Sequence, residues 1–255
     1  MNVIQINGAA IVDTKVSGDG NTLIVRCVKN TAEKKDGQWG TKPNYFTMLF
    51  RDAQRERFEK MKAKPGSSIW VIGSYTTSTY TGSADESGVP KTYLNITVNP
   101  YDFGYSSGSF GSTGLFDVTH TNIGIIADPT TVSGDFHYVD GLYDIGYGDN
   151  QRTEKVRLCF NGALPSCIGK GKRVDIIGRV DIALNQGKDG KTYVNKTVYV
   201  KECNKTPFTP KKENPADGAQ PPVEAVQTPV QPNAAQSSLD FTDFEDVSVD
   251  SGVFF

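Results

Sequence analysis

The stretch KTYLNITV at residues 91–98 recurs one hundred positions later as KTYVNKTV at residues 191–198, and six of the eight residues are identical. Two shorter sequence repeats occur in the same order along the chain. Residues 16–19 return as 132–135, and a pattern of glycine and branched residues at 66–73 returns at 171–178. Because chance similarity would not be expected to preserve that order, the sequence predicts one structural unit used twice.

Apolar alternation and β-branched runs predict five strands in the first unit. They lie at residues 3–11, 22–29, 45–50, 69–79 and 92–98. A helix is predicted at 52–64, because Phe58 and Met61 lie three residues apart among charged residues and a Pro-Gly pair follows. Three strands, one helix and two strands is the order of elements in a five-stranded OB barrel.

The second unit shows a weaker version of the same pattern, with strands predicted at 121–126, 136–147, 155–160, 173–184 and 192–201. Pro165 leaves little room for a helix between its third and fourth strands, so the helix is expected to be lost or reduced to one turn. The prediction is an all-β fold of two tandem five-stranded OB-fold barrels, the first with a short helix between strands 3 and 4. The predicted domains are barrel 1 at 1–103, a flexible linker at 104–114, barrel 2 at 115–208, a disordered Pro-rich spacer at 209–238 and a docking tail at 239–255.

The net charge of −2 conceals an asymmetry along the chain. Lys and Arg against Asp and Glu number 13 to 10 in residues 1–113, 12 to 11 in 114–208 and 2 to 8 in 209–255. A mildly basic body predicts a polyanionic partner, and an acidic tail indicates protein docking or self-screening. A solvated tail without function is the alternative.

The tail changes character near residue 239. Residues 209–238 contain six prolines and no aromatic residue, so they cannot bury enough apolar surface to become ordered. The last stretch interleaves acidic and aromatic side chains, which is unusual for a merely solvating segment and predicts a docking peptide. The docking candidates are Asp240, Phe241, Asp243, Phe244, Glu245, Asp246, Phe254 and Phe255.

Several function classes are disfavoured by the composition. No membrane-span pattern or signal peptide is present, which predicts a cytoplasmic protein. The four cysteines form no Cys-x-x-Cys pair and the two histidines add no ligand cluster, so neither a metal nor a cofactor is expected. An enzyme is not expected either, since the carboxylates are scattered and histidine is scarce.

Aromatic and basic residues interleave in the way that single-stranded nucleic acid requires, because bases stack on rings while cations follow the phosphates whatever the base sequence. Candidate contacts in the first unit are Lys34, Lys35, Trp39, Lys42, Tyr45, Phe46, Phe50, Arg51, Tyr75, Tyr80, Lys91 and Tyr93. Candidates in the second unit are Tyr147, Lys155, Arg157, Arg179 and Tyr193, although aspartates dilute the cations there. The second unit is therefore predicted either to bind DNA or to serve mainly in assembly.

Ordinary packing competes with stacking at several of these positions. Phe46 and Phe50 share one face of a strand, and Tyr45 and Arg51 share the other. At least one face must be core, so the sequence leaves both core packing and base stacking open for Phe50. Trp39 follows a turn sequence, where a core role is less natural, and stacking is favoured.

The chain resembles the bacterial single-stranded DNA-binding proteins, including the kind with two OB units per chain. The opening strand at residues 4–8, the third strand at 45–50 and the segment at 64–73 carry the resemblance, with Tyr80 where the family has a stacking aromatic. Trp39 and Phe50 fall near further stacking positions. The resemblance implies sequence-independent binding and protection of single-stranded DNA in replication, recombination and repair, in a bacterial or phage-infected cell.

The resemblance also implies that the tail recruits replication and repair proteins and that two chains assemble as a homodimer of four barrels. The tail departs from the family pattern, because residues 247–249 interrupt the acids and no proline precedes the terminal phenylalanine. A different or phage-type set of partners is therefore an alternative. A single-stranded RNA-binding or primosome-type adaptor module also stays open, because interleaved aromatics do not separate DNA from RNA.

Overall fold

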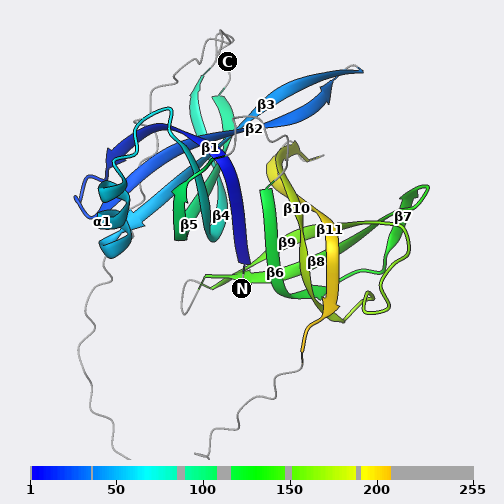
Figure 1. Ribbon diagram of the computed structural model, residues 1–255. Coiled ribbons are helices and arrows are strands. Elements are labelled where there is room, and N and C mark those ends of the chain that lie inside the picture. Colours follow the sequence, from blue (N-terminus) through cyan, green and yellow to red (C-terminus); the bar gives the residue numbers. More distant parts are fainter. Residues whose placement is uncertain are drawn as a thin grey trace, which may run out of the picture. The chain divides into compact units, whose positions relative to one another are not determined.

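The first five strands close a barrel around an apolar interior. The computed structural model describes residues 2–35, 37–84, 90–107, 116–146, 151–187 and 191–207 (Figure 1). The elements are β1 (Asn2–Val16), β2 (Thr22–Lys35), β3 (Gln38–Arg51), α1 (Asp52–Met61), β4 (Ser68–Ala84) and β5 (Pro90–Tyr105). The strands pair in the closed order β1-β2-β3-β5-β4-β1, parallel only between β3 and β5. This is the predicted OB barrel, with α1 between the third and fourth strands as predicted.

The second barrel repeats this topology. Its strands are β6 (Phe116–Ile125), β7 (Thr130–Ser133), β8 (Phe136–Ile145), β9 (Arg152–Asn161), β10 (Arg173–Gln186) and β11 (Thr192–Lys205). They close in the order β6-β8-β9-β11-β10-β6, again with one parallel pair, β9 and β11. The described residues 162–172 make turns and no helix, as predicted. The short strand β7 was not predicted, because all four of its residues are exposed and show no apolar alternation.

The strands run further than the sequence predicts, which corrects the start of the linker. Gly104 and Tyr105 belong to β5 because they pair with Trp70 and Ile69 of β4. Residues 108–115, Pro-rich residues 209–238 and tail residues 239–255 lie outside the described part of the chain.

The repeated glycines have a structural reason. A Cβ on Gly73 of β4 would lie 2.3 Å from the backbone oxygen of Asn99, and one on Gly178 of β10 would lie 2.5 Å from that of Tyr199. Only glycine allows the neighbouring strand to approach this closely at the two equivalent register shifts.

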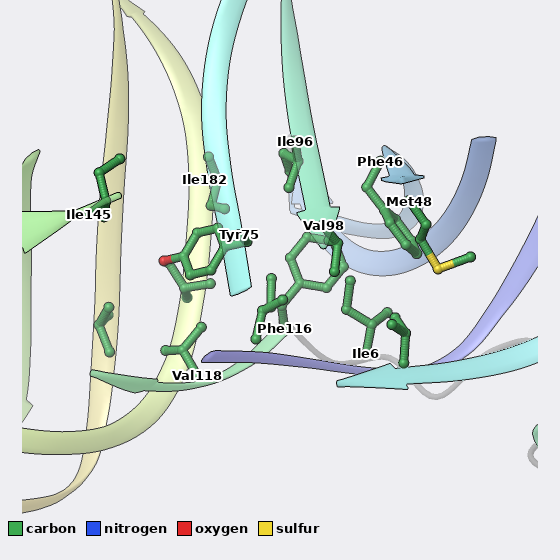
Figure 2. Close-up of a cluster of buried hydrophobic side chains, with 14 of the residues drawn as sticks. Ile6, Phe46, Met48, Tyr75, Ile96, Val98, Phe116, Val118, Ile145 and Ile182 are labelled. Carbon is green, nitrogen blue, oxygen red and sulfur yellow. The ribbon is translucent and has the colours of Figure 1, made fainter. Parts of the chain in front are cut away.

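The two barrels share one sheet and one core. Strand β1 pairs with β6 in antiparallel fashion, from Asn2↔His120 to Gln5↔Asp117. The rings of Phe46 and Phe116 meet edge to face at 6.1 Å. Figure 2 shows Phe116 and Val118 of the second barrel among Ile6, Val98 and Tyr75 of the first. Apolar burial across this junction stabilises the pair as a unit.

A buried polar network crosses the same junction. His120 Nδ1 lies 2.8 Å from Asn2 Oδ1, and His120 Nε2 lies 3.1 Å from the hydroxyl of Tyr75. The Asn2 amide nitrogen donates to a backbone oxygen, so its Oδ1 accepts from Nδ1. Nε2 then accepts from Tyr75, which leaves the imidazole neutral.

Acid is expected to destabilise the junction through His120. Burial, together with the charges of Lys196 and the N-terminus, lowers the pKa of His120 from 6.5 to about 3. Between these values the unfolded chain binds a proton that the folded chain does not, so stability is lost as the pH falls through the interval. His120→Gln should flatten this loss in urea unfolding measured across the interval, while His137→Gln, the control, should keep it. An equal loss of stability on acidification in both variants would contradict the attribution to His120.

Candidate functional site

One face of the first barrel, which we call the outer face of the first barrel, carries the predicted contacts Tyr45, Arg51, Tyr80, Lys91 and Tyr93. Register places its residues together: Thr47 of β3 pairs with Thr97 of β5, and Asn95 and Tyr93 of β5 pair with Ser78 and Tyr80 of β4. Alternate residues of a strand point to the same side, so Tyr45 and Arg51 share this face with Thr47. The result is a polar strip, in which Thr47 and Asn95 are only 7% and 8% exposed, bordered by aromatic rings and cations.

A stacked tyrosine pair stands on the β4–β5 hairpin of this face. The rings of Tyr80 and Tyr93 are 5.3 Å apart between centroids and 18° from parallel. Lys91 Nζ lies 5.4 Å from the centroid of the Tyr93 ring. Gly82 makes room for that ring, because a Cβ there would lie 2.6 Å from it. Tyr80 is 37% exposed, so the hairpin presents flat aromatic surface next to a positive charge.

Further groups on the same barrel extend the site. Tyr45 is 40% exposed on β3, where it faces away from the core. Arg51 Nε donates to Thr22 Oγ1 at 3.2 Å and the side chain is exposed, while Lys42 is half-buried. Within the described part of the chain, none of Lys42, Arg51 and Lys91 forms a salt bridge with a carboxylate. No described carboxylate therefore competes with an anionic ligand for these three cations.

Three predicted contacts are corrected by the structure. Phe46, Phe50 and Tyr75 are only 1%, 0% and 2% exposed, and all three belong to the core. Phe50 packs against Phe58 of α1 with centroids 4.5 Å apart, which closes one end of the barrel. A base has no access to these rings, so the prediction that they stack on nucleic acid is wrong.

The predicted cations of the second barrel are held by carboxylates. Lys155 and Arg157 both contact Asp140, at 2.6 and 3.0 Å, and Arg179 lies 3.7 Å from Asp117. Burial raises the pKa of Asp140, but hydrogen bonds from Arg157 and Lys155 outweigh it and hold the pKa below its ordinary value. A phosphate would have to compete with these carboxylates for the same guanidinium and ammonium groups.

Register shows how the outer faces of the two barrels differ. Arg157 pairs with Thr197 as Thr47 pairs with Thr97, so Lys155 takes the place of the exposed Tyr45. The second barrel thus presents a paired cation where the first presents a ring.

Tyrosines still line the outer face of the second barrel. Tyr193 is 51% exposed on β11, as predicted for a surface residue. Sequence reasoning missed Tyr199, 42% exposed, and Tyr138, whose ring lies 5.6 Å from the guanidinium carbon of Arg157. Tyr199 of β11 and Tyr138 of β8 are both register partners of Cys159 in β9, the strand that lies between them. Register partners point to the same face of a sheet, so the two rings share one face. The six-residue spacing of Tyr193 and Tyr199 was the available signal, because an even spacing on a strand means a shared face.

Some predicted contacts lie outside the described part of the structure. They are the side chains of Lys34, Lys35, Trp39 and Tyr147 and the docking residues 240–255. Among the described residues there is no cluster of three or more metal-ligating side chains. Nor does any described helix have the length and apolar character needed to span a membrane.

Comparison with known proteins identifies related folds. No protein-family model and no curated protein matches the chain. The wild-type single-stranded DNA-binding protein from Thermus aquaticus is 15% identical, with 84% of this chain and 97% of that chain covered and a TM-score of 0.50. A deletion mutant of the Thermus aquaticus protein is 16% identical, with 83% and 97% covered and a TM-score of 0.48. A Plasmodium falciparum complex with single-stranded DNA is 17% identical, with 41% and 94% covered and a TM-score of 0.30.

The likeness to the wild-type Thermus aquaticus protein confirms the predicted fold. It covers nearly the whole of that chain and most of this one. The resemblance noted from the sequence is therefore confirmed at the level of the fold.

Proposed function

We propose that the protein binds single-stranded DNA without reading base order, chiefly through the outer face of the first barrel. The observation that carries this proposal is the stacked pair of Tyr80 and Tyr93 beside Lys91, on the same face as Tyr45. Base stacking on such rings contributes about 1–3 kcal/mol per base and tolerates any base. The cations Lys42, Arg51 and Lys91, which form no salt bridge within the described ranges, would follow the phosphates.

The second barrel has a different role in this proposal. Asp140 and Asp117 already neutralise its predicted cations, so it contributes less phosphate binding than the first barrel. Its fixed pairing with the first barrel through β1 and β6 supports an assembly role. Tyr193 and Tyr199 would add weak stacking contacts for a long strand.

The cellular role is part of the same proposal. The protein would coat and protect single-stranded DNA during replication, recombination and repair in the cytoplasm of a bacterial or phage-infected cell. Residues 239–255 would recruit partner proteins, and two chains would form a homodimer of four barrels. The fold shared with the Thermus aquaticus protein and the acidic, aromatic composition of the tail support these roles.

A competition titration tests the binding proposal. Fluorescence anisotropy of a labelled oligo(dT) would be followed while unlabelled oligo(dT), oligo(U) or duplex DNA is added. We expect oligo(dT) to compete best and duplex DNA worst, because stacking needs unpaired bases. Log affinity should fall with log salt by about 0.7 per phosphate contact. Preference for oligo(U) would favour the RNA-binding alternative, and absence of binding to every ligand would overturn the proposal.

A further inference from the structure

The two barrels are closed at the same end by different elements and side chains. In the first barrel, Phe58 of α1 packs against Phe50 and Phe103, with ring centroids 4.5 and 5.9 Å away. Cys203 in β11 takes the position that Phe103 holds in β5. It pairs with Ile176, two residues before Gly178, as Phe103 pairs with Val71, two residues before Gly73.

A loop without helix replaces α1 in the second barrel, and we call residues 162–172 the plug loop. Its side chains of Leu164, Cys167 and Ile168 are partly buried against the core. Turn hydrogen bonds hold the loop, such as Ile168 N to Pro165 O at 2.9 Å and Gly171 N to Ile125 O at 2.8 Å. The plug loop therefore presents smaller side chains to its barrel than Phe58 of α1 presents to the first.

Two thiols, of Cys167 and Cys203, take the place of the contact that Phe58 and Phe103 make in the first barrel. Cys167 Sγ of the plug loop lies 3.7 Å from Cys203 Sγ, and both residues are only partly buried. This is van der Waals contact, and a disulfide requires the sulfurs to close to about 2.05 Å. A small shift of the plug loop or a change of side-chain rotamer supplies that movement. The other two cysteines, Cys27 and Cys159, are buried.

We propose that Cys167 and Cys203 are a covalent modification site, at which exchange with a low-molecular-weight disulfide forms an intramolecular bond that ties the plug loop to β11. The Cys167 thiolate attacks one sulfur of the small disulfide, forms a mixed disulfide and releases one small thiolate. The Cys203 thiolate then attacks the Cys167 sulfur and displaces the second small thiolate. Two protein thiols are oxidised, one small disulfide is reduced to two small thiols, and the two protein protons end on the released thiolates.

The surroundings of the two thiols set the order of these steps. Burial, followed by the interaction with Cys167, raises the pKa of Cys203 to about 12. The raised pKa disfavours Cys203 as the first nucleophile, so the first attack comes from Cys167. The part of the rise that comes from Cys167 ends once Cys167 is modified, and Cys203 then gives up its proton and attacks. Contact between the two sulfurs makes the second step intramolecular, which favours ring closure over a lasting mixed disulfide.

The experiment uses the full-length reduced chain and oxidised glutathione. After incubation, the chain is unfolded in excess N-ethylmaleimide, and intact mass spectrometry counts the alkylated thiols. The expected result is a fall from four alkylated thiols to two, with a proteolytic fragment that joins Cys167 to Cys203. Cys159→Ser should still form the bond, whereas Cys203→Ser should keep a glutathione adduct on Cys167.

Other outcomes would overturn the assignment. They are four alkylatable thiols at every glutathione ratio, a bond that includes Cys27 or Cys159, or covalent dimers on a non-reducing gel. Far-UV circular dichroism of each variant would show that it folds, and Cys167→Ala serves as a second variant should Cys203→Ser unfold. None of these readouts involves nucleic acid, so the result does not depend on the proposed binding function.

Discussion

Replacement of both Tyr80 and Tyr93 by alanine is expected to weaken binding of oligo(dT) by about 100-fold, because each stacked base contributes about 1–3 kcal/mol. The two rings lie 5.3 Å apart on the β4–β5 hairpin, so a base that stacks on one is adjacent to the other. Their removal also takes the ring from beneath Lys91. Anisotropy titration at fixed salt measures the change.

Matched variants separate stacking from general damage to the barrel. Tyr101→Ala removes a tyrosine that is 50% exposed but lies near α1, where Gln54 Nε2 donates to its backbone oxygen. This control should bind as the unmodified chain does. The double replacement by phenylalanine keeps both rings and should retain most of the affinity. Equal affinity in the double alanine variant and the Tyr101 control would remove the stacked pair from the binding site.

The sequence was sufficient to predict which side of β5 faces the core, and the reason is periodicity. Tyr93 alternates with Asn95 and Thr97, whereas Leu94, Ile96 and Val98 take the opposite side, so the polar side was expected at the surface. The repeat also predicted the fold, because two copies of one strand pattern imply two copies of the barrel.

Sequence periodicity failed where both sides of a strand are apolar. In β3 the side with Phe46 and Phe50 and the side with Tyr45 and Leu49 are both rich in apolar residues, and alternation alone does not say which is inside. Tyr75 was misassigned for another reason: the second barrel buries it at the junction, through His120. The carboxylate partners of Lys155 and Arg157 likewise depend on strand register, which a single sequence does not give.

The repeated stretch differs at one buried position, which lies at the junction because the Lys196 ammonium group is 5.4 Å from the centroid of the Tyr75 ring. Ile96 of the first copy corresponds to Lys196 of the second, and both are buried, at 2% and 4% exposed. Lys196 Nζ donates to Glu154 and, at 3.0 Å, to the hydroxyl of Tyr143. The hydroxyl of Tyr143 in turn donates to Glu154 Oε2 at 3.2 Å. A lysine in a barrel interior is tolerated because its ammonium group has these partners.

Lys196→Met is therefore expected to lower the free energy of unfolding by about 3–5 kcal/mol, because it leaves the carboxylate of Glu154 without its buried partner. The Glu154 side chain is 15% exposed and, among the described residues, keeps Arg152 at 3.0 Å and the hydroxyl of Tyr143 at 3.2 Å, which do not replace the buried ammonium group. Urea unfolding at neutral pH measures the loss. Adding Glu154→Gln to Lys196→Met should recover part of it, because a neutral amide costs less to bury than an unpaired carboxylate. Lys201→Met, which breaks an exposed pair with Asp117, should cost at most about 1 kcal/mol. A loss at Lys196 no larger than at Lys201 would show that the ion pair does not hold this part of the junction.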